Sequence, residues 1–445
     1  MKKKTPTSLD VFSEDQLAAE LARRRAARFD TDVTLAEDAL EASSNHDQQL
    51  AFQTYLDSHT NKEDKTAKPC PLCKQLIRVR APSRPREVRT VSGQFILKRN
   101  YHYCTKCKHG FYPLDLKLGL PAEGELTPKM ELRVLDFGLA CVYSEAAERW
   151  SVHYQSSISA SLIREVVERV GARAEAIEPK ALQRALQTPK FESELLVVET
   201  DGSMLRTREG WKEAKLAVVY REENHVVGTA TNRGLVTEAR YVAVLGGQKE
   251  FKEELKAALE LERAEATPTV AWLGDGARGN WTLADTLCPN AIQILDHIHA
   301  IENGNKFAKA VLGEGSDCLP LWEARLRELL MQGDVNALVS EIFWCITETP
   351  KKNLKELNDI IGFYRNNEER MKYPEYIKMG LPIGSGAVES GHKHVFQKRM
   401  KLSGQQWDFE CGHRMAKLRA GYRTCGGTRR LYRAVSDPAL LRRST

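Results

Sequence analysis

The sequence has 445 residues, of which 42% are hydrophobic and 28% charged, and its formal net charge is +6. This length and apolar content exclude a single small domain and predict two or three domains with sizeable cores. The sequence lacks an apolar run of about 18 residues, which a membrane-spanning helix would need, and its Met-Lys-Lys-Lys start lacks an apolar signal segment. We therefore expect a cytoplasmic protein without membrane contact.

The positive charge is concentrated in two segments. Residues 61–110 hold 13 Lys and Arg against 3 acidic residues, and residues 393–443 hold the same numbers. Each segment therefore carries +10, and the rest of the chain carries −14. Two basic segments around an acidic middle are typical of a protein that holds a polyanion such as a nucleic acid. Ordinary solvated surface charge is the alternative.

Residues 1–60 are polar and contain a weak helical pattern. Leu17, Leu21 and Phe29 fall on one side of a helix, but Arg25 interrupts the stripe. The pattern predicts an amphipathic helical N-terminal region of one or two helices, and it indicates no particular function.

Two Cys-x-x-Cys pairs follow, Cys70 with Cys73 and Cys104 with Cys107. Each pair can place two thiolates on one tight turn, and two such turns complete the tetrahedral site that Zn²⁺ prefers. The segments between the pairs are rich in β-forming residues, so residues 61–120 are predicted to form a zinc ribbon, in which a hairpin links the two turns. A redox role or chance pairing is the alternative, although redox motifs rarely come as two matched pairs.

The predicted hairpin is both basic and aromatic. Its cations could contact phosphates, and its rings could contact bases or sugars. The cations are Arg78, Arg80, Arg84, Arg86, Arg89, Lys98 and Arg99, and the rings are Tyr101, His102 and Tyr103. This composition favours a nucleic-acid surface, and a purely structural ribbon is the alternative.

Residues 121–185 are predicted to be helical. Thr127 and Pro128 form a typical helix start, and helices are expected over residues 130–143, 144–150 and 159–170. Three helices with a short middle one fit a helix-turn-helix-like DNA-binding domain. Any small helical bundle would give a similar pattern.

Two stretches in the middle of the chain share one design. Residues 195–202 are four apolar residues followed by Glu-Thr-Asp-Gly, and residues 269–276 are a mainly apolar run followed by Gly-Asp-Gly. Each suits a buried strand that ends at a polar edge of the sheet. Further strands are expected over 212–221, 225–231, 240–245 and 291–295, and helices over 249–265 and 281–287. This order is that of the ribonuclease H-like fold, an α/β fold with a mixed sheet, and residues 190–304 would be its first part. The first and fourth strands of that fold are neighbours, so Asp201 and Asp275 should meet.

The pattern changes again in the last third of the chain. Apolar stripes at helical spacing predict an all-helical insertion over residues 305–380, and residues 381–425 are assigned to the last part of the core. There a glycine-rich approach leads to Glu389 on the first turns of a basic helix. Residues 426–445 are predicted to be a frayed basic tail.

Asp201, Asp275 and Glu389 are the candidate catalytic and metal-binding residues. Carboxylate oxygens suit Mg²⁺ or Mn²⁺, and two such ions about 4 Å apart can hold the attacking and leaving oxygens of a phosphodiester. Each acid alone could be a capping or surface residue, so the prediction depends on their convergence. Glu199 points to the same strand face as Asp201. It is kept as an accessory candidate, because only Asp201 lies at the strand end beside a glycine.

Four motifs carry a resemblance to a known family: Asp201-Gly202, Gly274-Asp275-Gly276-Ala277, Asp296-His297-Ile298-His299 and Leu381-Pro-Ile-Gly-Ser-Gly-Ala-Val-Glu389-Ser390. From the ribbon to about residue 425, the chain resembles a DDE-type insertion-sequence transposase of the bacterial Kra-type family, a relative of the Mutator-like enzymes. The resemblance implies that the three acids form a catalytic triad for phosphodiester hydrolysis and transesterification by two metal ions. Its partners would be the element's terminal inverted repeats and target DNA, bound at the nucleoid by a homodimer or higher oligomer.

The resemblance extends to the pair Asp296 and His299. The Mutator-like group carries Asp-x-x-His after its second acid, and here His299 could contact phosphate or the leaving strand. Equally, the pair could hold the sheet to the insertion. Lys393, Lys398 and Arg399 follow Glu389 and are expected to bind DNA.

The chain departs from the commoner family motif at Gly391-His392-Lys393, which comes shortly after Glu389 and leaves that acid intact. Two alternative functions remain open. A ribonuclease H-like nuclease without strand transfer would differ only in its products, since it would not join them to target DNA. A domesticated, transposase-derived DNA-binding protein would be expected to have lost one acid, and all three are present.

Overall fold

The computed structural model describes residues 13–26, 33–63, 65–121, 124–154, 156–188, 193–227, 234–347 and 354–441. The Met-Lys-Lys-Lys start, residues 228–231 of a predicted strand and residues 442–445 of the predicted tail lie outside this part. The chain forms two compact units. We call Met1–Val134 with Ser144–Ala160 the hairpin unit, and Leu135–Tyr143 with Ser161–Thr445 the sheet unit.

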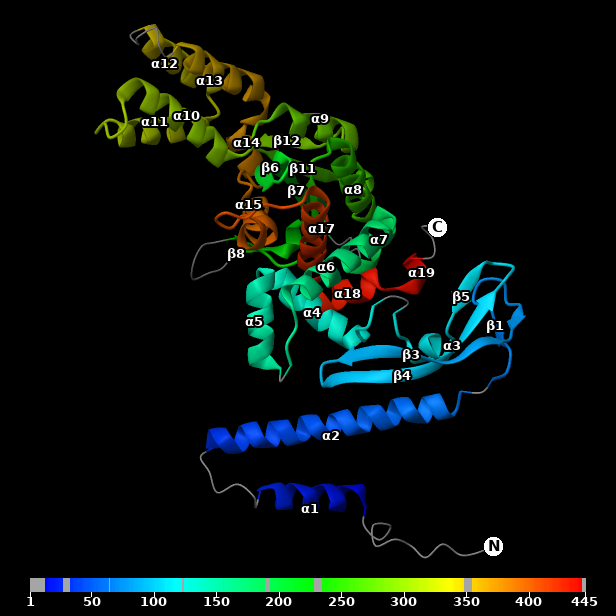
Figure 1. The fold of residues 1–445 in the computed structure, drawn as a ribbon. Coiled ribbons are helices and arrows are strands. Elements are labelled where there is room, and N and C mark those ends of the chain that lie inside the picture. The colour runs from blue at the N-terminus through cyan, green and yellow to red at the C-terminus, as the bar shows by residue number, and fades with distance from the viewer. Residues whose placement is uncertain are drawn as a thin grey trace, which may run out of the picture. The chain divides into compact units, whose positions relative to one another are not determined.

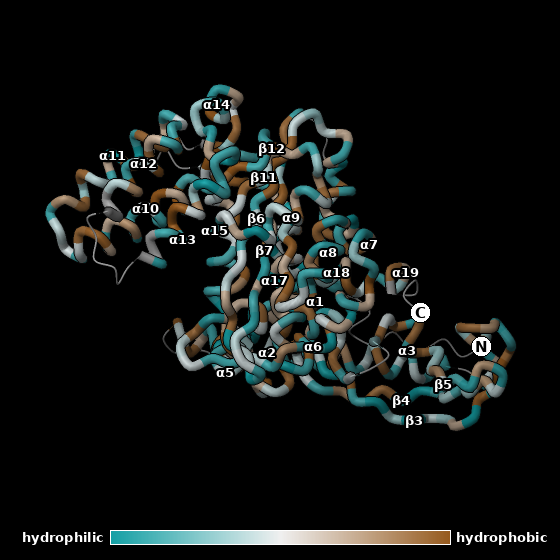
Figure 2. The backbone as a smooth tube through the Cα atoms, turned by 90° about the horizontal axis from the view of Figure 1, so that it is seen from above, coloured by the Kyte–Doolittle hydropathy of each residue, from teal (hydrophilic) through white to brown (hydrophobic). Residues whose placement is uncertain are grey.

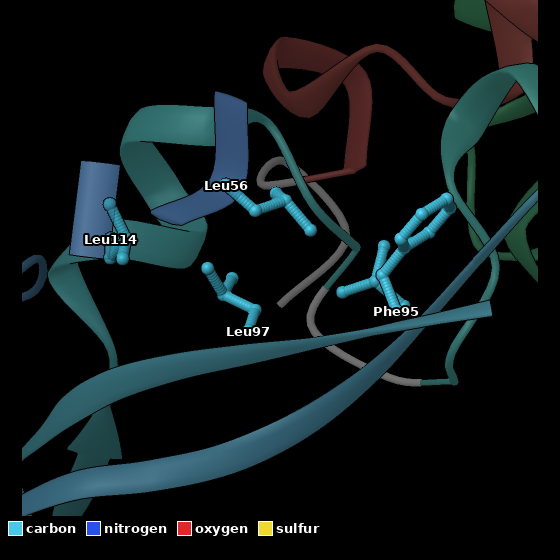
Figure 3. Packing of buried hydrophobic residues seen from close by; sticks show 5 residues of the cluster. Leu56, Phe95, Leu97 and Leu114 are labelled. Carbon is cyan, nitrogen blue, oxygen red and sulfur yellow. The ribbon is translucent and has the colours of Figure 1, made fainter. Parts of the chain in front are cut away.

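The hairpin unit is built on a long antiparallel hairpin, with strand order β3-β4-β5. Its elements are α1 (Glu14–Ala26), α2 (Val33–Asn61), β1 (Lys68–Pro69), β2 (Leu76–Ile77), β3 (Val79–Thr90), β4 (Gly93–Cys104), β5 (His109–Phe111) and α3 (Pro113–Leu118). Leu56 of α2, Val88 of β3, Phe95 and Leu97 of β4 and Leu114 of α3 form a buried apolar cluster (Figure 3). The end of α2 therefore packs on the hairpin, although the sequence indicated no role for this helix.

Four helices follow the hairpin: α4 (Pro128–Ala140), α5 (Tyr143–His153), α6 (Ala160–Glu175) and α7 (Pro179–Leu186). The three helices expected over this region are present, and the middle one is longer than predicted, with 11 residues. Their assignment to a helix-turn-helix remains a prediction.

The sheet unit contains a mixed five-stranded sheet in the order β10-β7-β6-β11-β12. Its strands are β6 (Leu195–Thr207), β7 (Gly210–Arg221), β10 (Arg240–Leu245), β11 (Thr269–Gly274) and β12 (Ile292–Leu295). β6, β7 and β10 pair antiparallel, whereas β11 is parallel to both β6 and β12. The prediction that the first and fourth strands are neighbours is therefore confirmed.

The strand predicted over residues 225–231 is not part of the main sheet. β8 (His225–Val227) pairs with β9 (Gly234–Val236) in a separate two-stranded sheet, and β10 takes the outer position beside β7. All six residues of β10 are buried. Burial of both strand faces suits its run of bulky apolar residues and explains its membership of the main sheet.

Helices of the sheet unit pack against this sheet, as Figure 1 shows. α8 (Gln248–Leu261) contacts β7 and β10, α9 (Arg278–Leu287) contacts β11, α15 (Gly386–His392) contacts β6 and β7, and α17 (Phe409–Cys425) runs along β10. The sheet unit also contains short helical segments: η2 (Glu222–Asn224), η3 (Ala264–Ala266), the π-helix η6 (Lys393–Gln397) and α16 (Lys398–Met400).

The segment that was predicted to be a frayed basic tail forms two helices within its described residues. It contains α18 (Thr428–Val435), whose Leu431, Tyr432 and Val435 are buried, and α19 (Pro438–Leu441). The regular spacing of these apolar residues is the reason that a basic segment still forms a packed helix.

A group of helices separates β12 from α15, in the region where an all-helical insertion was predicted. It comprises α10 (His297–Leu312), α11 (Leu319–Gln332), α12 (Val335–Thr347), α13 (Leu354–Asn367), η5 (Glu368–Arg370) and α14 (Tyr373–Lys378). Hydrophobic and hydrophilic segments alternate along these helices (Figure 2), as their apolar stripes predicted. The helices begin at His297, directly after the sheet, and not at residue 305. No helix within the described residues is long and apolar enough to cross a membrane.

Candidate active site at the sheet edge

Three aspartates lie level with one another at one edge of the sheet. β6 and β11 are parallel, with Leu273 opposite Glu199, and β11 and β12 are parallel, with Gly274 opposite Leu295. When these registers are continued, Asp275 falls opposite Asp201 and also opposite Asp296. Asp275 and Asp296 directly follow the last residues of β11 and β12, and the charge of Asp275 affects Asp201. β6 continues past Asp201 to Thr207, paired with β7, so the prediction that Asp201 lies at the end of its strand is wrong.

Asp201 is the most constrained of the acids that remain accessible. Its side chain is 23% exposed, and its Oδ2 lies 3.2 Å from Nε2 of His392. Its Oδ1 accepts a hydrogen bond of 2.8 Å from the Gly202 backbone. Burial raises the pKa of Asp201, and the negative charges of Asp275 and Glu389 raise it further, while His299 and the Gly202 bond oppose this. All three predicted catalytic acids are therefore close enough to interact.

Asp275 is oriented by the turn that follows β11. Its Oδ1 accepts hydrogen bonds from the Ala277 backbone at 3.0 Å and from Nδ2 of Asn280 at 2.8 Å. Gly276 has a φ of 94°, and a Cβ there would lie 2.6 Å from the ring of Phe363. The Asp-Gly sequence is thus needed for two reasons, a left-handed backbone and close packing.

Glu389 is exposed on α15, and Glu199 anchors this helix to the sheet. Oε2 of Glu199 accepts a hydrogen bond of 2.8 Å from the Val388 backbone, and Oε1 accepts one of 2.8 Å from the Tyr220 hydroxyl. Glu199 is 1% exposed, and burial raises its pKa to about 7. Glu199 therefore acts as a structural anchor beneath the site.

Asp296 is a second buried anchor of the same helix. Its Oδ1 caps α10 by accepting from the Ile298 and His299 backbones at 2.6 and 2.9 Å. Its Oδ2 accepts from the backbone of Ser385, at 2.5 Å, and from the Ser385 hydroxyl. Burial alone would raise the pKa of Asp296, but hydrogen bonds from His299 and Ser385 hold it well below the usual range. Asp296 thus joins the end of the sheet to the start of α15.

His299 lies between this anchor and the accessible acids. Its Nδ1 is 3.5 Å from Oδ1 of Asp296. The interaction with Asp296 raises the pKa of His299 to about 9, although burial opposes the shift. His299 is therefore protonated at neutral pH, and it adds one positive charge beside Asp201 and Asp275.

Three further residues near the acids were not predicted from the sequence. His392 and Asn280 lie beside Asp201 and Asp275 as described. Burial lowers the pKa of Lys401, and the charge of Asp201 opposes this shift. Helical spacing gave a usable signal for His392, because a residue three positions after Glu389 lies on the same side of a helix. Asn280 and Lys401 gave no such signal.

The prediction that Arg399 binds DNA is wrong. Its side chain is 1% exposed, and its Nε donates a hydrogen bond of 3.1 Å to the Gly138 carbonyl. Its guanidinium lies over the rings of Tyr143 and Trp407, at 4.7 and 5.2 Å from their centroids. Arg399 is thus a core residue held by cation–π and hydrogen-bond contacts. Lys393 and Lys398 are exposed and stay candidates.

In the hairpin unit, Cys70, Cys73, Cys104 and Cys107 form a compact cluster whose sulfur atoms all lie within 4.8 Å of one another. Each pair ends in a left-handed residue, Lys74 or Lys108, with φ of 64° and 51°, as a tight turn around two thiols requires. This cluster could bind Zn²⁺. Within the described part of the chain, no other group of three Cys, His, Asp or Glu ligand atoms is this close, and the three accessible carboxylates at the sheet edge are farther apart.

The basic surface of the hairpin is smaller than the sequence predicted. Arg86 is buried in an ion pair of 2.8 Å with Asp115, which also pairs with Arg99, and Arg89 pairs with Glu125 at 2.9 Å. The exposed cations are Arg78, Arg80, Arg84 and Lys98. Arg80 lies over the ring of Tyr103, 4.8 Å from its centroid, so an exposed cation and an aromatic ring lie together on this surface.

Comparison with known proteins gives one family assignment. Residues 75–436 match the uncharacterised protein family UPF0236, and the chain belongs to this family. No curated protein matches the sequence. Among solved structures, the Drosophila P element transposase strand transfer complex matches with a TM-score of 0.33 and 11% identity, over 70% of this chain and 95% of that one. A TM-score this low does not establish a common fold.

Proposed function

We propose that this member of the UPF0236 family is a DDE-type DNA transposase, which cleaves the ends of an insertion sequence and transfers them to target DNA. Asp201, Asp275 and Glu389 would be its catalytic residues, in line with the motif resemblance to the Kra-type and Mutator-like enzymes. The observation that carries the proposal is that β6 and β11 are adjacent and parallel, with a register that reaches Glu199 and Leu273, two positions before Asp201 and Asp275. The strand order matches that of the ribonuclease H-like fold, which supports it further.

The donor chemistry of the sheet edge fits Mg²⁺ or Mn²⁺. Asp201, Asp275 and Glu389 offer only oxygen ligands, and the repulsion among them raises the pKa of Asp201 in addition to the effect of burial. A divalent cation would relieve that repulsion, because it replaces a like-charge contact with an attractive one. When bound, such ions supply an activated water and neutralise charge on the phosphate.

The protein's own residues supply orientation. Asn280 and the Ala277 backbone fix the carboxyl plane of Asp275, and the anchors Glu199 and Asp296 fix the helix that carries Glu389. His299, protonated at neutral pH because of Asp296, can donate to a phosphate oxygen beside the acids. These groups hold the scissile phosphate and the attacking hydroxyl in line, so catalysis depends mainly on positioning.

DNA would be held by exposed cations of both units. Lys393 and Lys398 follow Glu389 on the same helical segment, and Arg78, Arg80, Arg84 and Lys98 lie on the hairpin. Zn²⁺ at the four cysteines would stabilise that hairpin, which is too small for a substantial core. Two element ends must be joined in one reaction, so we expect a dimer or larger assembly on DNA.

The test uses the purified full chain with Mg²⁺ or Mn²⁺ and DNA that carries the inverted repeats flanking the gene. We expect cleavage at the repeat ends and products joined to a target plasmid. Asp201→Ala, Asp275→Ala and Glu389→Ala should each lower cleavage at least about 1000-fold while DNA binding persists. Asp359→Ala, an exposed acid in the insertion, is the control and should keep full activity.

Three results would contradict the proposal. Cleavage without joined products would indicate a nuclease, and unchanged cleavage in any of the three acid variants would exclude that acid from the site. DNA binding with no cleavage under either metal would favour a DNA-binding protein without catalysis.

A further inference from the structure

Helix α18 carries three arginines on the side opposite its buried apolar residues. Arg429, Arg430 and Arg433 are all exposed, and we call them the arginine face. Arg429 and Arg433 are four positions apart, a spacing at which like charges on a helix repel. α18 contains no acidic residue, so the helix itself supplies no charge that offsets this repulsion.

Other cations of the basic C-terminal segment are neutralised by acids. Arg414 pairs with Glu175 at 2.8 Å, and Lys417 pairs with Glu254 at 2.6 Å. For the arginine face, the part of the chain that the structure describes supplies no ion pair. The arginine face is therefore a concentration of positive charge that the fold of the sheet unit does not use.

A cavity beside the arginine face is lined by a fourth arginine. Its volume is about 630 Å³, and its lining includes Arg423, Arg430 and Tyr241, with Glu238 as the one acid. The guanidinium of Arg423 lies over the ring of Tyr241, 5.4 Å from its centroid. Its Nε is buried without a hydrogen-bond partner among the described residues. Guanidinium donors match the oxygens of a phosphate group, so this cavity suits a phosphate.

Arg423 also connects the arginine face to the lysines that we propose to hold DNA. Burial lowers the pKa of His394, and the positive charges of Arg423, Lys398 and Lys393 lower it further. The same histidine is therefore within electrostatic reach of all three cations. A continuous basic surface runs from Lys393 and Lys398 past Arg423 to α18, within the sheet unit.

We propose that the arginine face and Arg423 bind phosphates of the DNA backbone and extend the DNA surface of Lys393 and Lys398 along α18. The inference rests on the proposed function, since it takes DNA as the ligand. A small anion in the cavity would leave Arg429 and Arg433 without a partner, whereas a phosphodiester backbone offers a row of negative charges. Backbone contacts carry no sequence information, so this surface should bind any duplex equally.

The experiment measures binding of a fluorescent DNA duplex to the zinc-loaded full chain, by anisotropy at several salt concentrations and without Mg²⁺ or Mn²⁺. The triple variant Arg429→Ala, Arg430→Ala and Arg433→Ala should bind about 10- to 100-fold more weakly near physiological salt. Its slope of log K against log salt should fall by about 2 to 3. The same three positions changed to Lys should keep most of the slope, because the charges remain. A duplex of scrambled sequence should give the same result.

The matched control is the double variant Arg325→Ala and Arg327→Ala. Both are exposed arginines of a helix, α11, but Glu341 and Glu323 pair with them at 2.7 and 2.6 Å. Since these charges are already neutralised, the salt slope of this variant should stay within about 0.5 of the wild type. Thermal unfolding of each variant checks its fold.

The outcomes distinguish this inference from the proposed function. If the triple Ala variant binds with the affinity and salt slope of the wild type while the wild type cleaves and joins DNA, the inference is overturned and the proposed function stands. A lowered slope together with no cleavage by the wild type keeps the DNA surface and refutes the catalytic proposal. A wild type that binds no duplex refutes both.

Two further results decide the role of the arginine face. Unchanged DNA binding by the triple Ala variant with a smaller assembly in light scattering would overturn the inference and assign this face to a second copy of the chain. If the triple variant does not fold, the single variants Arg429→Ala and Arg433→Ala decide. Each should lower the slope by about 0.9, and unchanged slopes in both overturn the inference.

Discussion

Glu199→Gln should remove a strong pH dependence from the stability of the sheet unit. Burial raises the pKa of Glu199 from 4.5 to about 7, so between these pH values the folded protein binds a proton that the unfolded chain has released. This contribution to stability is fully present below pH 4.5 and is lost as the pH rises through 7. The free energy of unfolding of the wild type should therefore fall as the pH rises from 4.5 to about 7.

The magnitude follows from the two pKa values. A change from 4.5 to about 7 corresponds to about 3 kcal/mol in the free energy of unfolding. The carboxyl group is 1% exposed, so solvent screening reduces this figure little. Gln imitates the protonated acid, because its Oε1 can accept from the Val388 backbone while its N–H donates to the Tyr220 oxygen. At pH 8 the variant should be more stable than the wild type by up to about 3 kcal/mol.

Urea unfolding of the full chain at pH values from 5 to 8, without added divalent cations, measures this difference. Glu209→Gln, at the exposed turn between β6 and β7, removes the same charge and should shift stability by less than about 0.5 kcal/mol at every pH. A difference between Glu199→Gln and the wild type that stays constant from pH 5 to 8 would refute the reasoning, since it would mean that Glu199 titrates alike in both states.

Three further predictions concern the metal cluster, the anchor and the DNA surface. Cys104→Ser should abolish binding of one Zn²⁺ per chain, measured by metal analysis, and should unfold the hairpin around it, measured by circular dichroism. Asp296→Ala should destabilise the protein by roughly 3 kcal/mol in urea unfolding, because it leaves the donors of α10 and of Ser385 without an acceptor; a loss below about 1 kcal/mol would contradict the anchor role. Replacing Lys393 and Lys398 together by Ala should reduce the slope of log K against log salt for DNA binding by about 2, whereas Lys378→Ala on α14 should not change it.

The order of elements could be predicted from the sequence because each strand carries its own signal. The apolar residues 195–198 and 270–273 predict buried strands, and an Asp-Gly pair follows each run within a few residues. The prediction that the first and fourth strands are neighbours came from the agreement of this order with that of the ribonuclease H-like fold. The position of β8 could not be predicted, since its short apolar run is the same whether it pairs in the main sheet or with β9.

The roles of individual charged residues depended on contacts far along the chain. Glu199 and Asp201 share a strand face, and only the contacts of Glu199 with Tyr220 and Val388 distinguish them. Arg399 follows two exposed lysines and looks like part of a basic surface, yet carbonyl and aromatic groups from distant segments enclose it. A sequence pattern gives the face of an element, but the partners that bury a charge come from the tertiary fold.

Hydrogen-bond capacity separates the acids at the sheet edge into two groups. Both oxygens of Glu199 and both oxygens of Asp296 accept from groups that hold α15 or α10, so these acids are committed to structure. The hydrogen bonds found for Asp275 within the described residues reach Oδ1 alone, and Glu389 is exposed. Asp201, Asp275 and Glu389 therefore keep acceptor positions that can face a ligand. Because the charges of Asp275 and Glu389 raise the pKa of Asp201 in addition to burial, the accessible acids are the group whose repulsion a bound cation would relieve.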